Sequence, residues 1–153
     1  MDSQKVLQDL LREILFGPPG DWAFVLNPGS PGLLAVLEPV AYSQAVKVPP
    51  GCNASIAAHT NHLLYSLDLI HQWAEGDPNP FATADWGRSW TVDGLDEQEW
   101  SQIKARLRDR SGYWLEFLSK PREWDPISLS GATASLPHIA YHFGAIKQLL
   151  KVS

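Results

Sequence analysis

The chain has a single cysteine, Cys52, and this scarcity excludes whole classes of site. One thiol cannot form an intramolecular disulfide, and it cannot build the cysteine-rich zinc sites of small structural domains. Any metal site must therefore use imidazole or carboxylate ligands. Cys52 itself precedes a predicted helix, and we expect its thiol to be inert.

Long apolar runs are missing too, because no stretch reaches the length of about 18 apolar residues that a membrane span needs. We therefore expect no membrane-spanning segment. The first residues (Met-Asp-Ser-Gln-Lys) are polar and differ from a signal peptide, so a cytoplasmic location is the expectation.

Positive charge is also scarce. The 12 Lys and Arg residues stand against 17 Asp and Glu residues, which gives a formal net charge of −5. Nucleic acids and anionic membranes both bind basic patches, so neither is an expected partner. The densest basic group spreads around a predicted helix and is expected to form a solvated face; it comprises Lys104, Arg106, Arg108 and Arg110.

Proline and tryptophan are plentiful by contrast, with 12 and 7 residues. The prolines lie between segments of periodic apolar residues, where they mark long connections rather than disorder. The length of 153 residues fits one compact domain, which we predict to span residues 1–153. Most tryptophans are expected to anchor the core or an interface. Trp86 and Trp90 lie in a long loop over residues 77–94 and are candidates to line a pocket.

Apolar residues at helical spacing predict four main helices and one short helix. The main helices are expected over residues 3–16, 53–75 and 95–119, and from a start between residues 131 and 137 to about residue 152. Pro137 suits the first turn of a helix better than its interior, which favours this late start. The short helix is expected over residues 32–46, where Pro39 shortens or kinks it. No segment alternates like a strand, so we predict an all-α four-helix bundle with long loops.

Capping signals support two of these helices. Asn53 or Ser55 can cap the start of the helix over 53–75, and Gly76 can end it. Asp96 and Glu99 have the spacing of a capping box at the start of the next helix. The beginnings of both helices are thus predicted from side-chain chemistry as well as from periodicity.

The spacing of the five histidines suggests metal chemistry. His138 and His142 are four residues apart, so they share one face of a helix and can share one metal ion. His59 and His62 are three apart on another helix, whereas His71 lies nine residues beyond His62 and points to the opposite side. His71 is therefore excluded. Such pairs also occur as ordinary core or surface histidines, and this is the alternative to a metal site.

A metal site needs ligands from at least two elements, and facing helices of a bundle can supply them. The pair on the last helix would need a third partner, and the residues alone leave His59 and His62 both open. Three imidazoles around a divalent ion leave a fourth position for water or substrate, as in catalytic sites. Neutral ligands also leave the charge of the ion uncompensated, which acidifies whatever else it binds.

Two stretches of the sequence resemble the DinB/YfiT-like family. This is the damage-inducible family and not the DNA polymerase of the same label. Residues 55–67 (SIAAHTNHLLYSL), followed by 73–76 (WAEG), are similar to the second helix of that family. Residues 138–148 (HIAYHFGAIKQ) are similar to its last helix, with the pattern H-x-x-x-H-x-G. The resemblance implies a four-helix bundle, often dimeric, with a three-histidine metal site.

The resemblance also implies which residues hold the metal. The family takes two ligands from the last helix, which are His138 and His142 here, and one from the second helix. The family ligand lies about four helical turns before the end of that helix, which favours His62. His59 is then a residue beside the metal, or the alternative ligand. Lys147 and Phe143 stand where relatives often carry arginine, so no substrate contact is carried over from Phe143.

Zinc or nickel is the expected ion, with iron and copper as alternatives, because imidazole suits all four. Similar bundles include thiol-dependent transferases and isomerases that use low-molecular-weight thiols such as bacillithiol or mycothiol, or glutathione in related cases. The resemblance thus implies a thiol transferase or a related hydrolase, and a homodimer. The alternative is a non-catalytic bundle in which the ion, or dimerisation, has a structural role.

Four further residues near the histidines are expected to be structural. Asp68 shares a helix with His62 but lies about 120° around its axis, so it is expected to face solvent. Tyr65 and Tyr141 flank the histidine segments and are expected to pack inside the bundle. Gly144 is expected to let two helices approach closely, and the alternative is that it opens room beside the metal.

Overall fold

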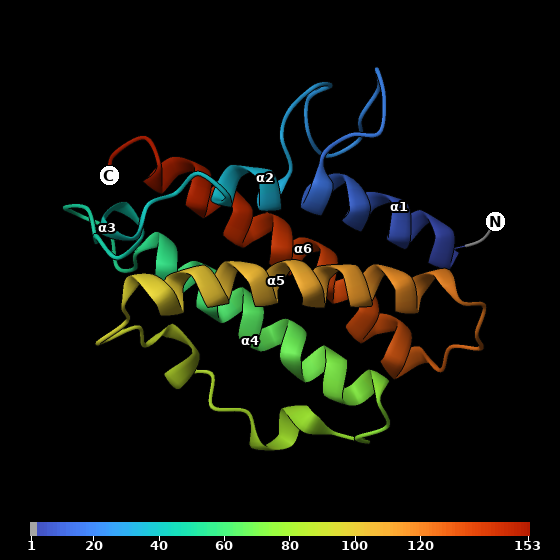
Figure 1. Ribbon diagram of the computed structural model, residues 1–153. Coiled ribbons are helices and arrows are strands. Elements are labelled where there is room, and N and C mark those ends of the chain that lie inside the picture. Colours follow the sequence, from blue (N-terminus) through green and yellow to red (C-terminus); the bar gives the residue numbers. More distant parts are fainter. Residues whose placement is uncertain (1–2) are drawn as a thin grey trace.

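The computed structural model describes residues 3–153, and helices are the only regular secondary structure within them. The four long helices are α1 (Ser3–Phe16), α4 (Ile56–Ala74), α5 (Glu97–Ser119) and α6 (Pro126–Leu149). The short ones are α2 (Leu33–Leu37), α3 (Tyr42–Ala45) and the 3-10 helices η1 (Pro80–Thr83) and η2 (Arg88–Trp90). The predicted all-α bundle is therefore confirmed (Figure 1). No helix of this region is long and apolar enough to cross a membrane.

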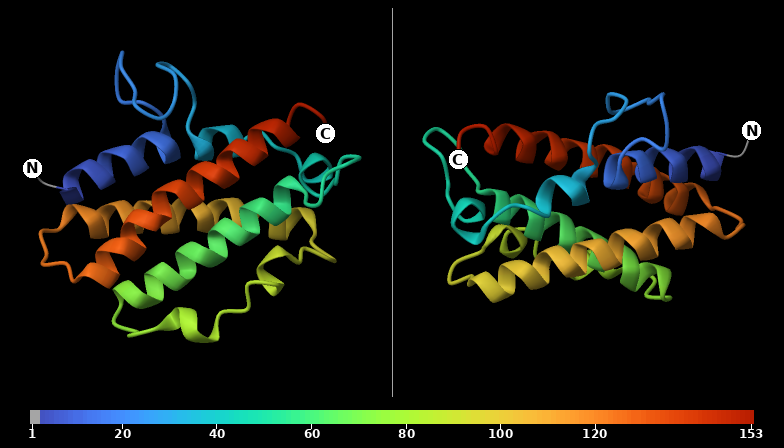
Figure 2. Two further views of the ribbon diagram at one scale, coloured as in Figure 1. Left: turned by 180° about the vertical axis from the view of Figure 1, so that it is seen from behind. Right: turned by 45° about the horizontal axis from the view of Figure 1, so that its top comes forward.

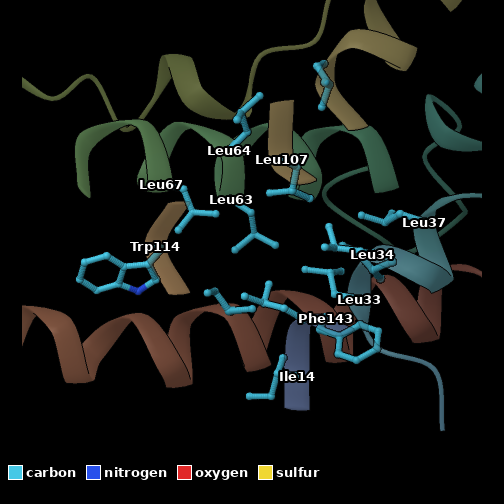
Figure 3. Close-up of a cluster of buried hydrophobic side chains, with 14 of the residues drawn as sticks. Ile14, Leu33, Leu34, Leu37, Leu63, Leu64, Leu67, Leu107, Trp114 and Phe143 are labelled. Atoms are coloured by element: carbon cyan, nitrogen blue, oxygen red, sulfur yellow. The ribbon is translucent and has the colours of Figure 1, made fainter. Parts of the chain in front are cut away.

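The four long helices form a closed ring around a shared apolar core. Both α1 and α4 pack against α5 and against α6, so the order around the ring is α1, α5, α4, α6. Seen from behind, α4 and α6 lie side by side, and the loop that carries η1 and η2 follows the outer side of α4 (Figure 2). Figure 3 shows side chains from several helices meeting in this core; they include Ile14, Leu63, Leu67, Leu107, Trp114 and Phe143. Burying each such side chain contributes about 1.5–3 kcal/mol to the stability of the folded state.

The ends of α4 are fixed by two local motifs. The side chain of Ser55, rather than that of Asn53, accepts a hydrogen bond from the backbone N–H of Ala58 and caps the first turn. At the other end Gly76 has φ +107°, which a side chain would disfavour. The N–H of Gly76 donates to Trp73 and the next N–H donates to Gln72, which is a Schellman motif. The position of the α4 histidines along the bundle follows from these two ends.

Helix α5 begins at the predicted capping box. The side chain of Asp96 accepts from the N–H of Glu99, whose own side chain accepts from the N–H of Asp96. The expectation that Asp68 faces solvent is wrong. Its carboxylate contacts Arg106 and Arg110 of α5, both at 2.6 Å, so this part of the basic face links α5 to α4.

The predicted start of the last helix is wrong, because α6 begins at Pro126 and Pro137 lies inside it. Asp125 caps the helix by accepting from the N–H groups of residues 127 and 128, and Pro126 occupies a first-turn position where its missing N–H costs nothing. Pro137 removes one helical hydrogen bond. Tertiary contacts compensate: Ser135 is buried and accepts a hydrogen bond from the indole N–H of Trp114.

The prediction of a single short helix over residues 32–46 is also wrong. The structure has two separate helices, α2 and α3, with Pro39 between them. The interruption leaves the carbonyl of Val40 free to accept from the buried indole N–H of Trp100 at 2.8 Å. A continuous helix would have used that carbonyl internally, so the break satisfies a buried tryptophan of α5.

Candidate metal site

Three histidines from α4 and α6 bring their Nε2 atoms together where these helices face each other. The Nε2 atom of His138 lies 3.1 Å from Nε2 of His62 and 3.1 Å from Nε2 of His142. The ligand atoms of these three residues all lie within 4.8 Å of one another. They form a cluster that could hold a metal ion, with one ligand from α4 and two from α6.

The two separations from His138 fit a shared cation. Metal–imidazole bonds of about 2.0–2.1 Å in tetrahedral geometry place two ligand nitrogens roughly 3.3 Å apart, close to the observed 3.1 Å. When two neighbouring imidazoles both carry their proton on Nδ1, their Nε2 lone pairs face each other. These lone pairs repel one another unless a cation lies between them. The donor set therefore fits a divalent ion that accepts nitrogen ligands.

Ser89 fixes the proton of His62. The hydroxyl of Ser89 donates to the carbonyl of Trp86 at 2.6 Å, so it accepts from Nδ1 of His62 at 2.7 Å. The proton of the neutral imidazole is then on Nδ1, and Nε2 keeps the lone pair that faces His138. Ser89 is buried, so no water competes for this bond. Such an outer partner orients a histidine ligand and raises its basicity.

His59 contacts Nδ1 of His142 and lies outside the cluster of three Nε2 atoms. Its Nδ1 atom lies 2.9 Å from Nδ1 of His142, so one of these two nitrogens carries the shared proton. If Nε2 of His142 binds a cation, Nδ1 of His142 must be the donor and Nδ1 of His59 the acceptor. His59 is thus placed to orient His142, as Ser89 orients His62.

Burial keeps these imidazoles neutral. Desolvation, followed by the charges that His138 and His59 would carry, lowers the pKa of His62 to about 4. Desolvation and the same kind of repulsion lower the pKa of His142 to about 3. Burial also lowers the pKa values of His59 and His138. All four rings are therefore uncharged near pH 7, which is the form that binds metal.

The loop around η2 covers the cluster with aromatic rings. Trp90 stacks on His62, with ring centroids 4.3 Å apart, and also contacts His59 and His142. Trp86 packs against His62 at 5.7 Å. The long loop made both tryptophans candidates to line a pocket. Ser89, which lies between them, was not predicted, because a serine in a loop has no spacing that relates it to a distant histidine.

A groove of about 1220 Å³ lies beside the cluster and is lined in part by His59, Trp90 and Tyr141. The expectation that Tyr141 packs inside the bundle is wrong, since it is 70% exposed, with its ring edge-on to His142 at 5.0 Å. The half-buried Cys52 also lines this groove. The groove therefore touches the histidine cluster through His59 and Trp90.

The other candidates lie outside the cluster. His71 packs edge-on to Tyr113, with ring centroids 4.3 Å apart, and contributes nothing to the Nε2 centre. The hydroxyl of Tyr65 accepts from the N–H of Asp85 and so supports the covering loop. The close helix approach expected at Gly144 is not observed, since a Cβ added there would meet no atom within 4 Å.

A family model described as the DinB superfamily matches residues 31–144. The match extends from just before α2 to most of α6 and includes all four histidines of the site region. Comparison with curated proteins and with solved structures gave no match.

Proposed function

The chain belongs to the DinB superfamily, and we propose that it binds one divalent metal ion through Nε2 of His62, His138 and His142. The observation that carries this proposal is that Nε2 of His138 lies 3.1 Å from Nε2 of both His62 and His142, while Ser89 holds the proton of His62 on Nδ1. Zinc or nickel is the ion we propose, with iron or copper as alternatives.

The ligand set favours a catalytic role. Within residues 3–153, no carboxylate or thiolate joins the three histidines. Structural zinc sites generally have four protein ligands, whereas sites with three keep a position for a substrate or water. When bound, the ion would supply Lewis acidity and make a coordinated thiol or water more acidic. We therefore extend the proposal to a metal-dependent enzyme of the thiol-transferase or hydrolase type.

The surrounding residues have defined tasks in this proposal. Ser89 and His59 hold the rings of His62 and His142 in orientation through their Nδ1 atoms. Trp86 and Trp90 cover the rings and limit the access of bulk water. Low water content strengthens electrostatic interactions in the site. The groove beside His59 gives a small molecule a route to this region.

Thiol transfer can be tested directly. In this reaction the sulfur of a low-molecular-weight thiol bonds to an electrophilic carbon, the bond from that carbon to its leaving group breaks, and the thiol proton passes to solvent. Chelator-treated protein, reconstituted with zinc or nickel, would be assayed with glutathione or cysteine and a chromogenic aryl halide, and in parallel with a chromogenic ester. We expect metal-dependent turnover in one assay, lost in His138→Ala and retained in His71→Ala.

The alternative is a bundle in which the ion only ties α4 to α6, or supports a homodimer. A metal at 100 times its Kd stabilises the folded state by about 2.7 kcal/mol. For a chain of this size that raises the Tm by roughly 5–10 °C. A metal-dependent rise in Tm or a metal-dependent dimer in sedimentation, without turnover in either assay, would favour this alternative.

A further inference from the structure

We propose that the groove beside the cluster binds a small molecule with an apolar body and a carbonyl oxygen, and that this oxygen accepts a hydrogen bond from Nε2 of His59. This inference rests on the proposed function, because a bound metal ion fixes the protons of His142 and His59. The groove lies between α4, α6, the segment after η2 and the C-terminal turn. It is distinct from the three proposed ligands, none of which lines it.

The lining of the groove indicates what it can hold. Its apolar part includes Val46, Val48, Val92, Leu95, Leu149 and Val152. Val48 and Val152 are 52% and 58% exposed, so this apolar surface is open to a ligand. Asp93 and Lys151 contribute one charge of each sign to the lining. A single cation cannot recognise a polyphosphate, so the groove favours an uncharged apolar molecule.

The inner wall of the groove connects it to the histidine cluster. His59 and Trp90 line the groove, and both contact His142. A ligand against this wall touches side chains that are one contact away from the proposed metal ligands. This continuity favours a substrate over a macromolecular partner as the occupant, since a small molecule can reach the inner wall.

Proton positions along this wall specify the polar contact. A cation on Nε2 of His142 leaves the proton on Nδ1, which donates to Nδ1 of His59. A neutral His59 then carries its own proton on Nε2. Within the described residues this nitrogen has no hydrogen-bond partner, and it lies on the ring edge away from His142. Because His59 lines the groove, we infer that this donor is open to a ligand there, and a carbonyl oxygen is the matching acceptor.

The test compares two ligands of nearly equal shape, 2-acetylnaphthalene and 2-ethylnaphthalene, by NMR titration of the zinc-loaded full chain. We expect both to shift signals of groove residues, and the ketone to bind about two- to tenfold tighter, the effect of one net hydrogen bond. His59→Phe should abolish this preference while keeping the ring. Val48→Lys should weaken both ligands, whereas Val6→Lys, at a similarly exposed valine of α1, should leave both unchanged.

The results separate this inference from the metal proposal. If the protein binds no metal but both ligands still shift groove residues with equal affinity, the proposed function fails and so does the carbonyl preference. If zinc binds but neither ligand shifts groove residues, or the ketone preference survives His59→Phe, the inference is overturned and the metal site stands. A dimer that dissociates in Val48→Lys would also overturn it, because a second copy would then occupy the groove.

Discussion

Helix α4 has a buried histidine, His62, in its first half and a half-buried histidine, His71, in its second half. The surroundings of the two side chains differ. Near its start, His62 meets two further imidazoles from α6, and within residues 3–153 no carboxylate joins this cluster. Near its end, His71 packs on Tyr113, whose hydroxyl donates to Glu75. Burial of a histidine alone is thus no indication of a metal. The converging lone pairs from a second helix distinguish the first half from the second.

The largest expected effect is on metal affinity. His138→Ala removes the nitrogen that lies 3.1 Å from both other ligands, so we expect affinity to fall by more than the roughly 100-fold that loss of an outer partner can cost. His71→Ala is the matched control at the other half of α4 and should keep wild-type affinity. Isothermal titration with zinc after chelator treatment measures both. Equal affinities in the two variants would remove the distinction between the halves.

Loss of the hydroxyl of Ser89 should have the next largest effect. Ser89→Ala frees Nδ1 of His62 and lets the proton move to Nε2, where it blocks the ligand position. We expect a 10- to 100-fold loss of zinc affinity with the fold retained. Ser101→Ala is the control, since that hydroxyl bonds only to the exposed backbone of α5. Unchanged affinity in Ser89→Ala would mean that another group holds the proton of His62.

Acid should destabilise the metal-free protein through the histidine cluster. The unfolded chain binds protons at His62 and His142 near pH 6.5, whereas the folded chain binds them only near pH 4 and 3. The free energy of unfolding is therefore highest above pH 6.5. It falls as the pH drops from 6.5 towards 4 and 3, because the unfolded chain takes up protons that the folded chain does not. Urea unfolding between pH 7 and 4 measures the decline. The double variant His62→Gln/His142→Asn should show a shallower decline, and an unchanged slope would contradict this account.

The smallest effect is expected at the other half of α4. Tyr113→Phe removes the hydrogen bond to Glu75 and should cost about 0.5–1.5 kcal/mol of unfolding free energy. Burial, with the neighbouring Glu75, raises the pKa of Tyr113 to about 12, so the phenol stays protonated in the folded protein well above pH 10. Chemical denaturation measures the cost. Zinc affinity should not change, and a change would mean that the two halves are coupled.

Local signals predicted much of the fold. Ser55 and Gly76 at the ends of α4, and the capping box of Asp96 and Glu99, involve partners within a few residues, and the structure confirms them. The start of α6 depended on a tertiary effect. Pro137 is tolerated inside the helix because the preceding turns pack on Trp114, and no local pattern reports such packing.

The candidate site, like the fold, was predictable where it depends on local spacing and not where it depends on tertiary contacts. The i, i+4 spacing of His138 and His142 requires only that their segment is helical, which makes the pair visible in the sequence. The choice between His59 and His62 depended on family resemblance, and the structure brings Nε2 of His62, not of His59, to the pair. Ser89 and the groove bring together residues far apart in the chain, so periodicity could not indicate them.

A crystal structure of protein grown with zinc, with anomalous diffraction recorded at the zinc absorption edge, tests the three-histidine site most directly. We predict one anomalous peak per chain, bonded to the Nε2 atoms of His62, His138 and His142 at about 2.0–2.1 Å. A peak bonded to His59 in place of His62, or no peak between α4 and α6, would contradict it.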